Sequence, residues 1–151
     1  MIQRAVELIK KHEGYSDTPY VCPAEKWTIG YGYNYQDRGF TTEELTELLM
    51  SGFDKEIAER LLEKDVLESF ELLKDNFEWF DRLDEGRKIA LLDMIYNLGL
   101  GRFKKFRKML SALQDEDFDR AAEEAINSRW YKQVKTRGER IVHAIRTGEI
   151  K

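Results

Sequence analysis

Three residues near the N-terminus have the side chains and the spacing to perform a hydrolysis. Glu13 is followed after eight residues by Cys22, and Cys22 after five more by Thr28. A carboxylic acid can protonate a leaving oxygen, a thiolate can activate water or attack an electrophile, and a hydroxyl can hold the water. The chain has only 1 cysteine, so it can form no internal disulfide and we expect a reducing compartment. Some function other than pairing must explain Cys22.

Each of the three residues also has a purely structural explanation. Glu13 could be a surface glutamate at the end of a helix, although the negative end of a helix dipole favours the protonated acid there. Cys22 could be a small buried apolar residue, and Thr28 could simply favour a strand. If Cys22 is inert, Asp17 or Glu25 from the same loop could supply the second carboxylate.

The pattern around these residues predicts the elements that position them. Apolar residues recur at helical spacing over residues 2–12, and Gly14 ends that helix. Residues 15–33 are rich in aromatic and β-branched residues with two prolines, which predicts a small β-meander. Glu13 is therefore expected where the helix meets the sheet.

The rest of the chain has helical periodicity. Thr41 and Glu44 have the spacing of a capping box, and the helix that they begin is expected to break at 51–52. In the next apolar run Asp84 is placed to cap a helix and Gly99 to stop it. A small sheet at one end followed by many helices indicates an α+β protein.

Length and charge exclude several classes of protein. A chain of 151 residues fits one domain with a full core, or two small lobes. The net charge of −4 argues against nucleic acid as the main partner. The charged N-terminal residues resemble neither a signal peptide nor a membrane anchor. His12 and His143 form no metal-ligand set with one cysteine, so no metal or cofactor is expected.

The segment from Glu13 to Gly32 resembles the catalytic signature of the phage-type lysozymes, glycoside hydrolase family 24. That signature is a glutamate, eight residues, Asp or Cys, five residues and a threonine in a T-I-G-x-G strand. The segment RKIALLDMIYNLG (Arg87 to Gly99) resembles the buried central helix of the family, and SRWYKQVKTRGERIVHAIRTG (Ser128 to Gly148) resembles its C-terminal region. The divergent part is about 34–82.

The resemblance implies a two-lobed lysozyme-like fold within the α+β class. A small β-meander lobe, about residues 13–55, would be joined to a larger helical lobe by a long helix at 52–64. Residues 1–12 and about 65–151 would form the helical lobe. The whole chain, 1–151, would be one catalytic domain with no separate wall-binding domain.

The same resemblance implies roles for individual residues. Glu13 would be the general acid, Cys22 would activate or position water where most relatives have an aspartate and some a cysteine, and Thr28 would hold that water. Many relatives have a histidine at the position of Tyr33, so any role of that histidine cannot be transferred. Arg137 would pair with the catalytic glutamate.

Further positions correspond to substrate contacts of the family. Tyr96 matches an aromatic residue that borders the sugar subsites. The other positions differ from the family in residue type: Asn34, Phe106 and Glu124. For Tyr96 and Phe106, core packing is an equally good explanation.

The implied activity is that of an endolysin, a muramidase. It would hydrolyse the β-1,4 bond between N-acetylmuramic acid and N-acetylglucosamine in peptidoglycan. The protein would be a monomer that accumulates in the host cytoplasm and needs a holin to reach the glycan strand in the wall. The alternative is a catalytically silent peptidoglycan-binding or virion structural protein of the same fold.

Overall fold

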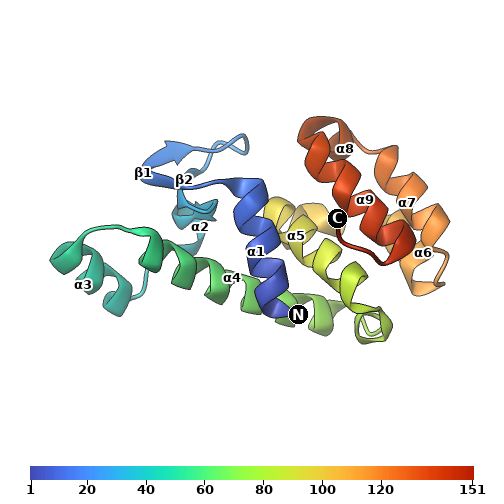
Figure 1. The fold of residues 1–151 in the computed structure, drawn as a ribbon, viewed down its shortest axis with the longest axis horizontal. Helices are drawn as coiled ribbons and strands as arrows, with labels where there is room; N and C mark the ends of the chain where they lie inside the picture. The colour runs from blue at the N-terminus through green and yellow to red at the C-terminus, as the bar shows by residue number, and fades with distance from the viewer. The chain divides into compact units, whose positions relative to one another are not determined.

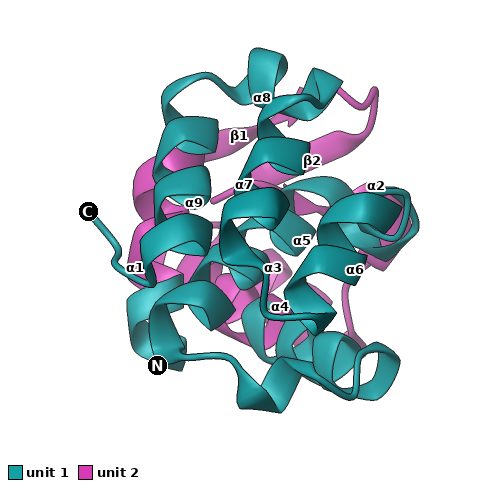
Figure 2. Ribbon diagram, turned by 90° about the vertical axis from the view of Figure 1, so that its right-hand side faces the viewer, with its two compact units in different colours: residues 1–5, 66–151 teal, residues 6–65 magenta.

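The computed structural model describes all of residues 1–151 and has an α+β architecture, as predicted. The chain divides into two compact units, and each is described by itself. Residues 6–65 form the unit that holds the sheet, and residues 1–5 with 66–151 form a helical unit, as coloured in Figure 2. Helix α1 (Ile2–Glu13) contributes residues to both units.

The sheet has three antiparallel strands in the order β1-β2-β3. They are β1 (Ser16–Val21), β2 (Trp27–Gly30) and β3 (Tyr33–Asn34). Tyr20 lies opposite Thr28 in the β1–β2 pair, and the register shifts between Ser16 and Tyr20. The predicted β-meander is therefore confirmed, and its central strand carries the candidate threonine.

Short helices follow the sheet in the same unit. They are α2 (Tyr35–Arg38), α3 (Thr42–Ser51) and the first part of α4 (Lys55–Asn76). The capping box of α3 is present, because the Thr41 hydroxyl accepts from the backbone N–H of Glu44 and the Glu44 side chain accepts from the Thr41 N–H. The apolar core of this unit contains Tyr33, Ile57 and Leu61.

The helical unit is built around α5 (Glu85–Phe103), which follows the short 3₁₀ turn η1 (Phe80–Arg82). Seven consecutive residues of α5, Ile89–Ile95, are buried. A helix that is apolar on nearly all sides lies inside a core, and the resemblance to the buried central helix of the family implied this burial. Gly99, with φ 77°, leaves the helical conformation and kinks α5 where the sequence predicted a stop.

Four shorter helices complete this unit, and Figure 1 shows them in orange to red. They are α6 (Arg107–Gln114), α7 (Phe118–Ile126), α8 (Arg129–Val134) and α9 (Thr136–Thr147). Helix α7 packs against both α6 and α9, and α9 packs against α5. None of the helices in the structure combines the length and apolar character needed to cross a membrane.

Two predicted details differ from the structure. Asp84 occupies the N-cap position of α5 but makes no capping hydrogen bond. Its carboxylate instead accepts from the Arg87 guanidinium at 2.7 Å, because a charged donor competes well with a backbone N–H. The helix expected at 52–64 is α4, which begins at Lys55 and continues to Asn76, since its apolar periodicity extends past Leu62.

Candidate active site

Glu13 is the last residue of α1, and its carboxyl lies directly over the backbone of Gly32. The backbone N–H of Gly14 donates to the Lys10 carbonyl and ends the helix, with Gly14 at φ +70°. A Cβ placed on Gly32 would lie 2.8 Å from both Cδ and Oε1 of Glu13. Glycine at position 32 therefore lets the carboxyl approach the turn that connects β2 to β3.

Cys22 lies at the start of the turn between β1 and β2 and is half-buried. Its N–H donates to the Lys26 carbonyl at 2.9 Å, and its carbonyl accepts from the Glu25 N–H at 2.8 Å. Burial raises the pKa of the Cys22 thiol, but hydrogen bonds from the backbone of Lys26, the side chain of Thr28 and the backbone of Ala24 outweigh it. The pKa of Cys22 is consequently lower than that of an ordinary thiol, which favours the reactive thiolate.

Thr28 connects the turn to the sheet. Its side chain is 2% exposed, and its hydroxyl donates to the carbonyl of Lys26 at 2.9 Å. A hydroxyl has one hydrogen to donate and two lone pairs that accept. The Thr28 hydrogen can therefore go either to the Lys26 carbonyl or to a Cys22 thiolate, and the second of these bonds helps to lower the pKa of Cys22, while the lone pairs can accept from a water.

Tyr20 is a member of this cluster that the sequence reasoning missed. It faces Thr28 across the β1–β2 pair and is half-buried. Burial raises the pKa of the Tyr20 phenol, and the charges of Glu13 and Cys22 raise it further. The sequence held one signal for this residue, because a position two before Cys22 points to the same side of an extended chain.

The four side chains offer three chemical functions within one small unit. Glu13 can exchange a proton, Cys22 can act as a thiolate base or nucleophile, and Thr28 and Tyr20 supply hydroxyls. This set suits the displacement of a leaving oxygen that requires both protonation and an attacking group.

The alternative carboxylates from the same loop are exposed. Asp17 lies on β1, and Glu25 lies in the β1–β2 turn with φ 63°. Tyr33, which replaces the family histidine, is 2% exposed and donates its hydroxyl hydrogen to the Gly39 carbonyl at 2.7 Å, so it is part of the core.

Asn34 also has a structural partner. Its side-chain oxygen accepts from the backbone N–H of Asp37 and thereby caps α2, and its amide donates to the Asp37 carboxylate at 3.1 Å. A substrate contact at Asn34 remains a prediction. It would have to share an amide that already holds the start of α2.

Arg137 is 9% exposed and lies on α9. Its Nε donates to Oδ1 of Asp93 at 2.7 Å. Asp93 is 0% exposed, on the buried face of α5. The ion pair was not predicted, although a lone aspartate inside the apolar run IALLDMI is the kind of buried charge that requires a partner. The pairing of Arg137 with Glu13 remains a prediction.

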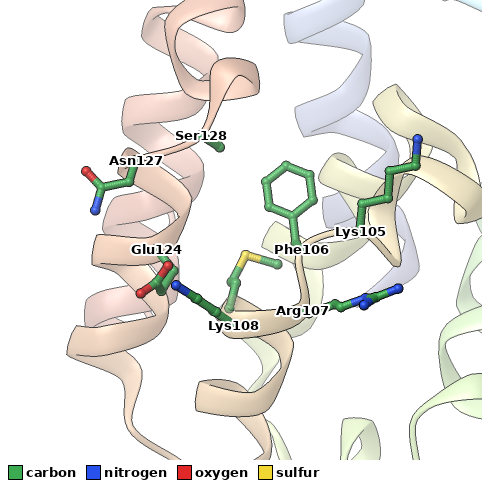
Figure 3. Close-up of a pocket in the computed structure, with 8 residues that line it drawn as sticks. Lys105, Phe106, Arg107, Lys108, Glu124, Asn127 and Ser128 are labelled. Atoms are coloured by element: carbon green, nitrogen blue, oxygen red, sulfur yellow. The ribbon is translucent and has the colours of Figure 1, made fainter.

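Two of the expected substrate contacts meet at a pocket of about 380 Å³ in the helical unit. Phe106, at the start of α6, and Glu124, on α7, both line it, and Figure 3 shows the Lys108 and Glu124 side chains extending toward each other. The remaining lining residues are Lys105, Arg107, Met109, Asn127 and Ser128. The Phe106 ring also packs edge-on against Trp130, so it has a packing role as well. Tyr96 is half-buried on α5.

Comparison with known proteins points to one family. A family model described as phage lysozyme matches residues 10–146. The chain is 28% identical over 167 residues to "Probable T4-type lysozyme 2" of Dictyostelium discoideum. That alignment covers 100% of this chain and 98% of the Dictyostelium protein. The chain is 27% identical over 138 residues to "Endolysin" of Acyrthosiphon pisum secondary endosymbiont phage 1. That alignment covers 91% of this chain and 84% of the endolysin. A shorter match, 34% identical over 68 residues, covers 45% of this chain and 12% of "Pre-baseplate central spike protein Gp5" of Enterobacteria phage T4.

Proposed function

Because the chain belongs to the phage lysozyme family, we propose that it is a muramidase that cleaves peptidoglycan. The bond is the β-1,4 linkage between N-acetylmuramic acid and N-acetylglucosamine, and the biological result is lysis of the host cell. The observation that carries the proposal is the cluster in residues 6–65. The carboxyl of Glu13 lies over Gly32, in the unit that also holds the Cys22 thiol in the β1–β2 turn and the Thr28 hydroxyl on β2.

In the proposed reaction Glu13 is the general acid. It donates a proton to the glycosidic oxygen as the bond to the anomeric carbon breaks, and the leaving sugar departs as an alcohol. Cys22 acts from the other side of the sugar ring as the thiolate, which its lowered pKa favours. Thr28 accepts a hydrogen from the attacking water and so holds it.

The role of Cys22 decides the stereochemistry. A thiolate that takes a proton from water gives inversion at the anomeric carbon, whereas a thiolate that attacks the carbon gives a covalent glycosyl-enzyme and retention. We propose inversion, because the resemblance places Cys22 where most relatives have an aspartate. Proton NMR of the first product formed from a soluble glycan fragment distinguishes the two outcomes by the anomer released.

The test of the function is the clearing of permeabilised Gram-negative cells by purified protein. Wild type should lower the turbidity, and Glu13→Gln should do so at least ~100-fold more slowly, because an amide cannot donate the proton. The matched control is Glu7→Gln on the same helix, where Glu7 is exposed and forms a surface ion pair with Lys10; it should clear cells at the wild-type rate.

One observation favours a second function. The match to a protein named as a central spike supports a virion structural or silent peptidoglycan-binding role. In that case wild-type protein would sediment with purified peptidoglycan but would clear no cells, and Glu13→Gln would bind equally well. Cell clearing by the wild type that is lost in a folded Glu13→Gln protein excludes this alternative.

The cellular setting follows from the same proposal. The protein would act as a monomer on glycan strands of the wall, would accumulate in the host cytoplasm, and would need a holin to leave it. Co-expression tests this directly. Cells that make the protein alone should remain intact, and the addition of a pore-forming holin should lyse them.

A further inference from the structure

Residues 102–108, here called the basic junction, concentrate positive charge on one short segment of an acidic protein. The segment connects the end of α5 to the start of α6. No Asp or Glu occurs between Asp93 and Asp115, while the chain as a whole has a net charge of −4. Five of the seven residues of the junction are cations: Arg102, Lys104, Lys105, Arg107 and Lys108. The junction is therefore a local positive surface on a molecule that is negative overall.

The charge of the junction is not neutralised within the chain. All five cations are exposed, and none of them forms an ion pair. Figure 3 shows Lys105 and Arg107 extending away from Glu124, whereas Lys108 extends toward it. Glu124 is the one acidic residue among those that line the pocket beside the junction, so it offsets a single cation. Most of the positive charge is consequently available to a partner outside the chain.

The stability of α6 does not explain this charge. Arg107 and Lys108 are the first two residues of the helix, at the positive end of its dipole, where cations are unfavourable. The first turn contains no acidic residue, and Phe106 at the N-cap makes no capping hydrogen bond. Helix α3 has the usual arrangement, with Glu43 and Glu44 in its first turn and a complete capping box. Binding by the exposed cations would explain a helix start that lowers stability.

We propose that the basic junction binds the anionic surface of a phospholipid bilayer. Clusters of about four to eight Lys and Arg residues are typical of sites for anionic lipids, and the junction has five. Long cationic side chains can spread over several head groups at once. The half-buried ring of Phe106 lies between the cations in sequence, and aromatic residues beside cations favour the membrane interface. No step of the proposed hydrolysis depends on this attachment, so the two proposals can fail separately.

Sedimentation of the full-length protein with vesicles tests the proposal. The wild type should bind vesicles of phosphatidylglycerol mixed equally with phosphatidylcholine, but not vesicles of phosphatidylcholine alone. Added salt should release it, because salt screens exposed charges. Lys104→Gln with Lys105→Gln removes two cations from the junction. Each cation near an anionic surface contributes about fivefold in affinity, so this double variant should bind roughly 25-fold more weakly.

The matched control is Lys132→Gln with Lys151→Gln, which changes the net charge by the same amount. Both lysines are exposed and lie outside the junction, on α8 and at the end of the chain, so this variant should bind nearly as tightly as the wild type. Equal weakening in both double variants, or equal binding to the two kinds of vesicle, would overturn the proposal, as would no binding. If the junction variant does not fold, as judged by circular dichroism, Lys105→Gln alone should bind about fivefold more weakly.

Purified peptidoglycan is the rival partner, because Phe106 and Glu124 beside the junction are expected substrate contacts. If Lys104→Gln with Lys105→Gln weakened sedimentation with peptidoglycan and left vesicle binding unchanged, the junction would be a substrate contact and the proposal would be wrong. Cell clearing by a wild type that binds no vesicles would reject the membrane contact and leave the muramidase proposal intact. Charge-dependent vesicle binding by a protein that clears no cells would support the membrane contact and reject the muramidase.

Discussion

At the scale of single residues, the Glu13 carboxyl occupies the space that a side chain at Gly32 would need. Gly32→Ala should lower cell clearing sharply, because its Cβ would lie 2.8 Å from the carboxyl at a φ of +76°. Backbone strain at such a φ costs about 1–2 kcal/mol, and the flexible Glu13 side chain would move aside, which displaces the carboxyl at little further cost in stability. Urea denaturation and turbidity measure the two effects.

Gly14→Ala is the matched control for this substitution. Gly14 has nearly the same φ, +70°, but nothing lies within 4 Å of a Cβ placed there. It should therefore show the backbone strain alone and keep most of its activity. Equal loss of activity in both variants would mean that displacement of Glu13 is not what inactivates Gly32→Ala.

Cys22 provides a second prediction at this scale. Cys22→Ala should be nearly inactive in cell clearing, whereas Cys22→Asp should retain substantial activity, because an aspartate can also activate water. Alkylation should inactivate the wild type, and its midpoint should lie at lower pH than for a free thiol, since the hydrogen bonds from Lys26, Thr28 and Ala24 lower the pKa of Cys22. A fully active Cys22→Ala protein would direct attention to Asp17 and Glu25.

At the scale of elements, the β1–β2 turn contains strain next to the thiol. Glu25 adopts φ 63°, in the left-handed region that favours glycine, and its N–H donates to the Cys22 carbonyl. Glu25→Gly should therefore stabilise the protein by about 1 kcal/mol in urea denaturation. Ala24 in the same turn has no positive φ, so Ala24→Gly relieves no strain and should not stabilise the protein.

The same variant tests the alternative assignment of the catalytic carboxylate. If Cys22 is the catalytic group, Glu25→Gly should clear cells at about the wild-type rate. Loss of activity in this more stable protein would instead assign the carboxylate role to Glu25.

At the scale of the whole molecule, the helical unit contains a buried charge pair inside an apolar core. Asp93 on α5 is 0% exposed and pairs with Arg137 on α9. Asp93→Leu should lower the free energy of unfolding by about 3–5 kcal/mol, because it leaves the guanidinium buried without its carboxylate. That is a large part of the about 5–15 kcal/mol that stabilises a typical domain.

The double variant Asp93→Leu with Arg137→Met separates desolvation from packing. Replacing both residues removes the buried guanidinium that has lost the Asp93 carboxylate, so much of the lost stability should return in thermal or urea unfolding. A double variant as unstable as Asp93→Leu alone would show that the cost comes from packing at position 93.

Local patterns determined which elements form and where several of them end. The capping box at Thr41 and Glu44 was predicted and is present, because all its atoms lie within one turn of helix. At Gly99 the sequence predicted a stop, and the structure has a kink there with the helix resuming to Phe103; the break itself is local, since a positive φ is a preference of glycine. Asp84 was the exception, because its carboxylate binds the Arg87 side chain in place of the backbone.

By itself the sequence determined the α+β class, the order of the elements and the candidate trio of Glu13, Cys22 and Thr28, since these follow from periodicity, spacing and resemblance. Only the tertiary structure revealed the approach of Glu13 to Gly32, the place of Tyr20 opposite Thr28, and the Asp93–Arg137 ion pair. The physical reason is that strand register and helix packing bring together side chains distant in sequence. Hydrogen bonds and burial at those contacts then set the pKa of a group such as Cys22.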